Sequence, residues 1–165
     1  MKYLITILSL TFFLVRIDAQ TISPATQVPN VFLIGEYEDQ YMALAKEHPA
    51  MFMSVYLNDI DIAFREWANV LMDIEDYADN MKFDIKGVKL WINLYFNADG
   101  TIAHLAFFPK PNSRNVPVEH LTAFFKNFVR EYKLNVEAAK PFQHSASAGF
   151  PTFFEREMAS TGKKN

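Results

Sequence analysis

The chain of 165 residues contains no cysteine. Disulfide bonds, catalysis by a thiolate and zinc sites built on cysteine are therefore excluded, as is a lipid anchor attached to a cysteine. An exported protein without disulfides depends on its hydrophobic core, which fits a bacterial envelope better than a disulfide-rich animal secretion. The sequence is 50% hydrophobic and contains 16 phenylalanines, which is ample for such a core and argues against disorder.

Strong positive charge is also missing. The formal net charge is −3, and no basic cluster stands out apart from Lys163-Lys164 near the end of the sequence. A protein that binds nucleic acid needs a basic patch to neutralise phosphates, so this class of function is excluded. No internal repeat is present, and a chain of this length is typical of a single domain.

Long hydrophobic runs are absent except for one, which extends from Tyr3 to Val15. Lys2 precedes this run and the small residue Ala19 follows it, a pattern typical of a secretory signal peptide. A helix over the run would span about 20 Å, which is short of a hydrocarbon core of about 30 Å. We therefore predict that residues 1–19 are removed and that the mature protein is periplasmic or secreted, without membrane insertion.

Cleavage of this segment has a direct test. Mass spectrometry of the protein from its native host is expected to show a mature N-terminus at or near Gln20, because the expected cleavage site follows Ala19. Recovery of an intact 1–19 segment from the membrane fraction would contradict the prediction.

The rest of the sequence divides into four segments by its periodicity and turn residues. Residues 20–35 hold two prolines and little charge, which predicts an extended lead-in. Residues 36–86 have mainly helical spacing, and residues 87–156 combine strands with one helix. Residues 157–165 are predicted to be a flexible tail.

Two helices are predicted in residues 36–86. The first ends at Pro49, and one of its faces holds Tyr37, Tyr41, Leu44 and Ala45. The second begins at Asn58, a plausible N-cap, and has apolar residues at steps of three and four: Ile60, Phe64, Trp67, Leu71, Ile74, Ala78 and Met81. The apolar stretch Met51–Leu57 between them is too short to assign, and both a buried strand and a helical turn stay open.

A β-hairpin is predicted in residues 88–108. Apolar residues alternate from Val88 to Phe96, opposite a face that contains Trp91 and Tyr95. The sequence Asn97-Ala98-Asp99-Gly100 follows, and an Asp-Gly pair between two strands is typical of a hairpin turn in which the glycine takes a positive φ. Ile102–Phe108 is the predicted second strand.

A further helix and a last strand are predicted after the hairpin. The helix covers Pro117–Tyr132, and its apolar stripe should lie across one face of the hairpin; the stripe consists of Leu121, Phe124, Phe125 and Phe128. A strand near Phe142–Ala146 should join the same sheet, because a two-stranded ribbon alone is marginally stable. We expect Trp67 of the long helix to pack near Trp91 and Tyr95.

The acidic turn can also be compared with the calcium loop of an EF-hand. If Gly100 is loop position 6, Asn97 and Asp99 fall at the ligand positions 3 and 5. Positions 1 and 12 are then Tyr95 and Ala106, so two required carboxylates are missing. The flanks have the period of strands, whereas an EF-hand needs helices. The turn is therefore predicted to close a hairpin and to bind no metal.

The segment "GVKLWINLYFNADGTIAHLAFFPKP" resembles the opening hairpin of TonB C-terminal domains. It has a glycine before the first strand, alternating apolar residues and an Asp-Gly turn. The helix 117–132 and the strand from Phe142 stand where that family has its helix and third strand, so the resemblance covers about residues 87–154. It implies an α+β fold in which N-terminal helices pack on a small antiparallel sheet in strand-strand-helix-strand order. It also implies binding of partner proteins by strand addition.

Other residues with reactive side chains carry no recognisable motif. The histidines are scattered, at His48, His104, His120 and His144. An acidic group on the long helix is expected to be its solvated face; it consists of Asp73, Glu75, Asp76 and Asp79. Ser145 and Ser147 lack the surroundings of a nucleophile elbow. We predict no catalytic, cofactor-binding or metal-binding residue and no cofactor.

Two functions from different classes follow from these patterns. The leading one is an exported, non-enzymatic protein-interaction module that binds an envelope protein through an exposed strand edge. The alternative is a small-ligand-binding protein or small hydrolase with an aromatic pocket between the helices and the sheet, around Trp67, Trp91 and Tyr95. A filled core with an open strand edge would favour the first function, and a cavity of roughly several hundred Å³ with convergent polar groups would favour the second.

Overall fold

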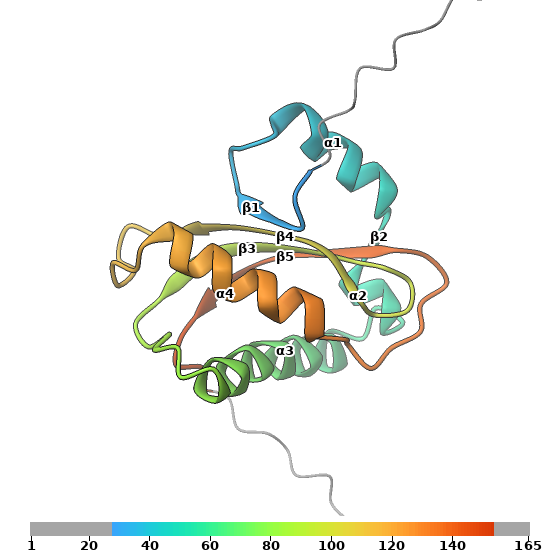
Figure 1. Cartoon of the computed structure of the whole chain (residues 1–165). Coiled ribbons are helices and arrows are strands. Elements are labelled where there is room, and N and C mark those ends of the chain that lie inside the picture. The colour runs from blue at the N-terminus through green and yellow to red at the C-terminus, as the bar shows by residue number, and fades with distance from the viewer. Residues whose placement is uncertain (1–27, 154–165) are drawn as a thin grey trace, which may run out of the picture.

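The computed structural model describes residues 28–153 (Figure 1). The predicted signal peptide, residues 20–27 of the predicted lead-in and the predicted tail lie outside the described residues. In chain order the elements are β1 (Val31–Leu33), α1 (Glu38–Glu47), β2 (Ala50–Met51), α2 (Phe52–Val55), α3 (Ile60–Asn80), β3 (Lys89–Phe96), β4 (Ile102–Pro109), α4 (Val118–Glu131) and β5 (Phe142–Gly149). The predicted α+β class is confirmed.

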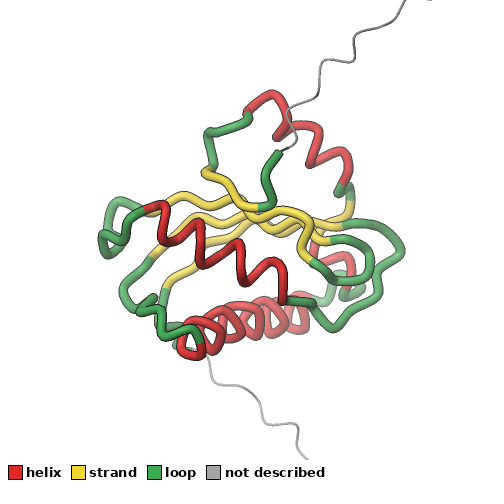
Figure 2. The backbone as a smooth tube through the Cα atoms, in the orientation of Figure 1, coloured by secondary structure: helices red, strands yellow, loops and turns green. Residues whose placement is uncertain are grey.

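The five strands form one sheet in the order β1-β4-β3-β5-β2, and the helices lie on both of its sides (Figure 2). The central strand β3 is antiparallel to β4 and to β5. The predicted hairpin is therefore confirmed, with a register shift next to its turn. No helix in the described part of the chain combines the length and apolar character needed to cross a bilayer.

Two short edge strands correct the prediction for the N-terminal segments. Residues 31–33 were expected to belong to an extended lead-in without a regular element, but they form β1, which is parallel to β4. Ala50–Met51 form β2, parallel to β5, and the next residues form the single helical turn α2. Both alternatives for Met51–Leu57 thus apply to parts of this region. The sheet is mixed rather than antiparallel, and strands of two or three residues are too short to show a period of two.

The alternation of β3 gives the sheet two different faces. The core face carries the buried side chains Leu90, Ile92, Leu94 and Phe96. The outer face carries Lys89, Trp91, Asn93 and Tyr95. Figure 1 shows α3 and α4 together on one side of the sheet and α1 on the other.

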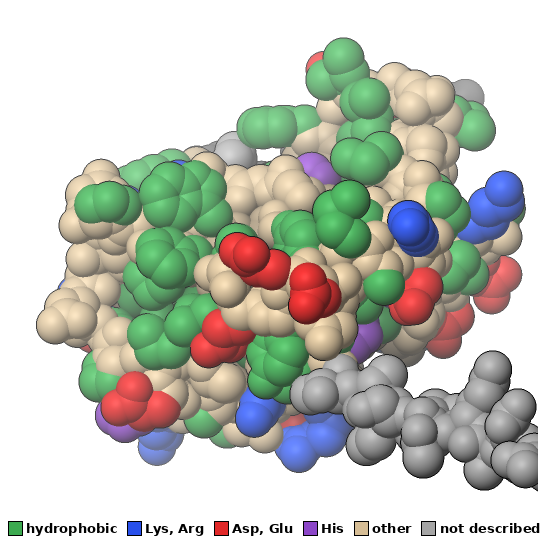
Figure 3. Space-filling model, turned by 90° about the horizontal axis from the view of Figure 1, so that it is seen from above, with side chains coloured by type: hydrophobic (Ala, Val, Ile, Leu, Met, Phe, Trp, Pro, Cys, Tyr) green, Lys and Arg blue, Asp and Glu red, His purple; other side chains and the backbone are tan. Residues whose placement is uncertain are grey.

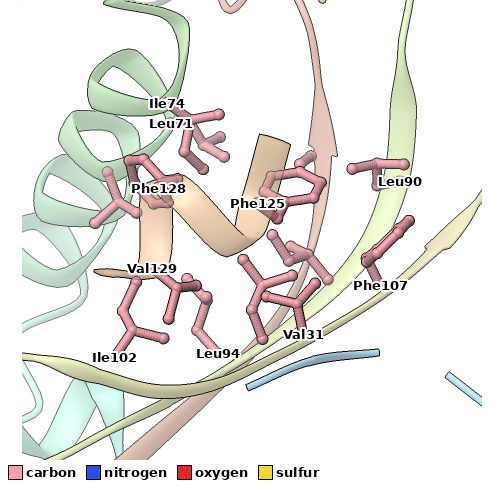
Figure 4. Packing of buried hydrophobic residues seen from close by; sticks show 14 of the residues in the cluster. Val31, Leu71, Ile74, Leu90, Leu94, Ile102, Phe107, Phe125, Phe128 and Val129 are labelled. Carbon is pink, nitrogen blue, oxygen red and sulfur yellow. The ribbon is translucent and has the colours of Figure 1, made fainter. Parts of the chain in front are cut away.

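The core lies between the core face and the two long helices. The four predicted stripe residues of α4 are all buried, and Figure 4 shows Phe128 beside Leu71 and Ile74 of α3. Phe125 is turned toward β4, where its ring centroid lies 5.3 Å from that of Phe107. The predicted packing of this helix on the hairpin is confirmed.

The long helix differs from its prediction at both ends. Its N-cap is Asp59 rather than Asn58, because Asn58 has a left-handed backbone (φ 61°) while the Oδ1 of Asp59 accepts hydrogen bonds from the N–H groups of Asp61 and Ile62, each at 3.0 Å. The middle of the predicted stripe is buried, at Trp67, Leu71, Ile74 and Ala78. Its end residues are exposed: Ile60, Phe64 and Met81.

Candidate binding surface at the edge of strand β5

The predicted aromatic pocket is not formed by the three residues expected to line it. Trp67 packs on the core face, with its ring centroid 4.4 Å from that of His144. Trp91 and Tyr95 lie on the outer face of the same sheet. The expectation that α3 would pack near them is therefore wrong. The core face is apolar along the whole of β3, so it takes up both long helices and leaves the outer face to α1.

The histidines do not converge. His104 lies on the outer face, where its Nδ1 is 3.0 Å from the carbonyl oxygen of Pro29, and His144 lies on the core face. His48 is buried against Tyr95, at 5.3 Å between ring centroids. His120 is exposed on α4. Within residues 28–153 no group of three or more histidine, aspartate or glutamate side chains is placed to hold a metal ion.

Of the four acidic residues on α3 that were expected to be solvated, Asp76 and Asp79 are exposed, whereas Asp73 and Glu75 are half-buried and make hydrogen bonds within the fold. The hydroxyl of Tyr132 donates to a carboxylate oxygen of Asp73 at 3.2 Å, and Glu75 accepts the backbone N–H of Thr152 at 2.7 Å. Ser145 and Ser147 lie on the outer face, opposite the core-face residue His144, so they do not form a nucleophile–base pair with it.

Asp99 stabilises the hairpin turn. Its Oδ1 accepts hydrogen bonds from the N–H and the hydroxyl of Thr101, at 3.0 and 2.7 Å, and these bonds hold the pKa of Asp99 below its usual value. Gly100 has the positive φ expected of the turn, at 86°. The carboxylate of Asp99 therefore helps to close the hairpin.

The outer face is covered at one end only. Tyr95 is buried beneath α1, where Leu44 and the ring of Tyr41 contact it. At the other end Trp91 is 44% exposed and its cross-strand neighbour Phe108 is 45% exposed. Figure 3 looks down on this side of the molecule and shows hydrophobic side chains exposed on it. Of the two large aromatic residues on this face of β3, only Tyr95 is covered by a helix.

One edge of the sheet is open. Strand β2 pairs with Phe142 and Gln143 of β5 and then leaves the sheet to form α2. The rest of β5, His144–Gly149, has β3 on one side and no strand of the described chain on the other. An open strand edge was predicted, but the sequence did not indicate which strand would provide it.

The backbone groups that face this edge follow from the register. The N–H of Phe150 donates to the carbonyl oxygen of Val88 at 2.9 Å, so even-numbered residues of β5 direct their N–H and C=O groups toward β3. The odd-numbered residues Ser145, Ser147 and Gly149 direct theirs outward. Both serine residues are exposed.

The opposite edge of the sheet is protected. Strand β1 has only three residues, and Glu36 folds back against it. The carboxylate of Glu36 accepts the N–H of Leu33 at 3.1 Å, and the N–H of Glu36 donates to the carbonyl oxygen of Leu33 at 3.0 Å. These contacts occupy backbone groups that an added strand would need.

A cavity of about 460 Å³ adjoins the open edge near the end of β5. It is lined by Leu71, Lys89, Ser147, Gly149, Phe150, Pro151, Thr152 and Phe153. Its walls combine apolar side chains with backbone of the open strand, which suits an extended chain segment with an apolar side chain.

Comparison of the chain with known protein families, with curated proteins and with solved structures finds no match.

The open edge was detectable in principle from one sequence signal, the run Ser-Ala-Ser-Ala-Gly in β5. This run contains no proline and no charged residue, the features that commonly protect an edge strand.

His144 makes stability depend on pH. Its ring lies between Trp67 and Phe52, and its Nε2 is buried without a hydrogen-bond partner. Burial lowers the pKa of His144 from 6.5 to about 4. Between these two values the unfolded chain binds a proton at this position and the folded chain does not. We expect this proton binding by the unfolded chain to lower the free energy of unfolding by up to about 3 kcal/mol as the pH falls from 6.5 to 4. Above pH 6.5 the effect should be absent.

Urea denaturation at several pH values measures the contribution of His144 to the free energy of unfolding. His144→Phe keeps an aromatic ring between Phe52 and Trp67 but removes the titrating nitrogen, so the difference between wild type and variant isolates His144. That difference should change between pH 6.5 and 4 and level off below. A difference that is constant over this range would contradict the assignment.

Proposed function

We propose that this protein is a non-enzymatic protein-interaction module that binds an extended segment of a partner by strand addition at β5. The observation that carries the proposal is the open edge of residues 144–149. Its outward N–H and C=O groups, on Ser145, Ser147 and Gly149, match the hydrogen-bonding pattern of one further strand.

The lack of blocking groups on the β5 edge supports this function. Long, flat strand edges are usually blocked by charge, proline, a bulge or a covering segment, because they otherwise pair with other chains. Strand β1 is blocked in this way by Glu36, whereas the outward residues of β5 are the small, uncharged Ser145, Ser147 and Gly149, and the lysines beside them belong to other segments. The contrast between the two edges of one sheet favours a binding role for β5.

The resemblance to TonB C-terminal domains is part of the proposal. The order β3, β4, α4 and β5 is consistent with the strand-strand-helix-strand arrangement that the resemblance implies. Export to the periplasm or beyond is proposed from the signal-peptide pattern of residues 1–19, and a partner in the cell envelope is proposed for a protein in that location. The alternative of an aromatic pocket has less support, because Trp67 is separated from Trp91 and Tyr95 by the sheet and none of the three lines the cavity beside β5.

Selected peptides test strand addition directly. Heptapeptides that bind the full chain can be isolated from a random library displayed on phage, and amide hydrogen exchange can then be measured with and without each peptide. We expect the amides of Ser145, Ser147 and Gly149 to exchange at least about tenfold more slowly in the complex, because a paired strand would hold them in hydrogen bonds.

Two substitutions at one position provide the control. Ser147→Pro removes an outward N–H that makes no bond to β3, and an edge strand tolerates proline at such a position. Ser147→Ala removes the same hydroxyl but keeps the N–H. The peptides should bind Ser147→Ala and fail to bind Ser147→Pro. Equal binding to both variants, or peptides that protect no amide of β5, would overturn the proposed function.

A further inference from the structure

Two lysines lie beside the open edge, and they indicate which partner segment fits it. We infer that the strand added by the partner carries acidic side chains on the outer face, opposite Ser147 and Gly149, and apolar side chains on the core face. This inference rests on the proposed function. The partner is thus an extended peptide segment in which acidic and apolar residues alternate.

Lys110 reaches the edge across Ser147. Its Nζ donates to the Oγ of Ser147 at 2.7 Å and lies 5.4 Å from the centroid of the Trp91 ring. A side chain directly opposite Ser147 on an added strand would have its Cβ about 5 Å from that of Ser147. A carboxylate at this position is close enough to pair with the Lys110 ammonium, because serine is too small to separate them.

The stem of the Lys89 side chain lies beside Gly149, its cross-strand neighbour. A Cβ placed on Gly149 would lie 3.9 Å from the Cγ of Lys89, and Lys89 lines the cavity at the edge. Gly149 has no side chain, so it leaves the lysine accessible from the position of an added strand. Ser147 and Gly149 are two residues apart, so a matching pair of acidic residues would be two apart as well.

No acidic side chain of the sheet neutralises these lysines. The outer-face residues of the three long strands are Lys89, Trp91, Asn93, Tyr95, His104, Ala106, Phe108, Gln143, Ser145, Ser147 and Gly149. Of the nearby acids, Asp84 pairs with Arg114 and Glu75 binds Thr152. The positive charge is local, because the whole chain has a net charge of −3. It complements an acidic segment.

Alternation places the other side chains of the added strand on the core face. There they meet the cavity at the end of β5, whose apolar lining is buried at Leu71 and Phe150 and exposed at Phe153. A valine or leucine next to each acidic residue would remove this apolar surface from water. The two faces of the edge thus select different side chains at adjacent positions of one segment.

Three designed peptides test the charge preference. Each has the sequence Thr-Val-X-Val-X-Val-Thr, in which both X residues are aspartate, asparagine or lysine. We expect the aspartate peptide to bind the full chain about tenfold more tightly than the asparagine peptide, its neutral isostere, and the lysine peptide to bind most weakly. Binding is measured by NMR titration at low and high salt, and the advantage of aspartate should shrink at high salt.

The double variant Lys89→Glu, Lys110→Glu should reverse the order of the aspartate and lysine peptides. If the three peptides protect the β5 amides but bind equally well, the charge preference is overturned and strand addition stands. If neither designed nor library-selected peptides protect these amides, the proposed function fails. If the free full chain is dimeric in sedimentation and its β5 amides are already protected, a second copy occupies the edge and the inference is overturned.

Discussion

Replacing Phe125 by aspartate is expected to unfold the domain. The side chain of Phe125 is fully buried between α4 and the core face, with ring centroids 5.3 Å from Phe107 and 5.2 Å from Phe124. Loss of a buried phenylalanine side chain costs about 3–5 kcal/mol, and an unpaired buried carboxylate adds several more. A domain of this size is stable by about 5–15 kcal/mol, so the substitution should remove most or all of its stability.

Circular dichroism and thermal denaturation measure the outcome. The variant should lose its near-ultraviolet signal and show no cooperative melting transition. Ala123→Asp is the matched control, because Ala123 is exposed on the same helix. The control should cost only about 0.5–1 kcal/mol through helix propensity. Cooperative melting of the Phe125 variant within a few degrees of wild type would contradict the packing of α4 on the sheet.

The parts of the fold that could be predicted have long and regular patterns. Strand β3 has eight residues that alternate between a buried and an outer face, and α4 carries its apolar residues on one stripe. Patterns of this length select one period clearly, so the hairpin and its covering helix follow from the sequence. The Asp-Gly turn also follows, because few residues other than glycine adopt the positive φ of Gly100.

The parts that could not be predicted depend on contacts between distant segments. Strands β1 and β2 are too short to have a period, and they exist because β4 and β5 offer them a partner. The sequence also did not determine which side of the sheet α3 covers, since a stripe of apolar residues does not indicate which surface it packs on. Trp67 and Trp91 therefore lie on opposite faces, although both are aromatic residues next to predicted apolar surfaces.

The candidate site shows the same limit. An open edge was predicted, but its location depends on where β2 leaves the sheet and on the contacts of Glu36 with β1. Both are decided by segments of a few residues. The lysines beside the edge are far from it in sequence, in β3 and after β4, and only the register of the sheet brings them next to Ser147 and Gly149.

Gly100→Ala is expected to lower the free energy of unfolding by about 3–5 kcal/mol. The positive φ of Gly100 costs a residue with a Cβ about 1–2 kcal/mol. The structure adds a second cost, because a Cβ at this position would overlap the carbonyl oxygen of Leu134. Leu134 cannot easily move away, since its N–H donates to the carbonyl oxygen of Gly100 at 2.9 Å and Ala138 donates to Ala98 at 2.8 Å.

Gly35→Ala separates the two costs. Gly35 also has a positive φ, at 99°, but no atom lies within 4 Å of the position its Cβ would take. This control should therefore lose only about 1–2 kcal/mol in urea denaturation, the cost of the backbone conformation alone. If both variants lost the same amount, residues 133–138 would not be packed against the hairpin turn. A larger loss at Gly100 would show that this segment holds the turn in place, and with it the register of β3 and β4.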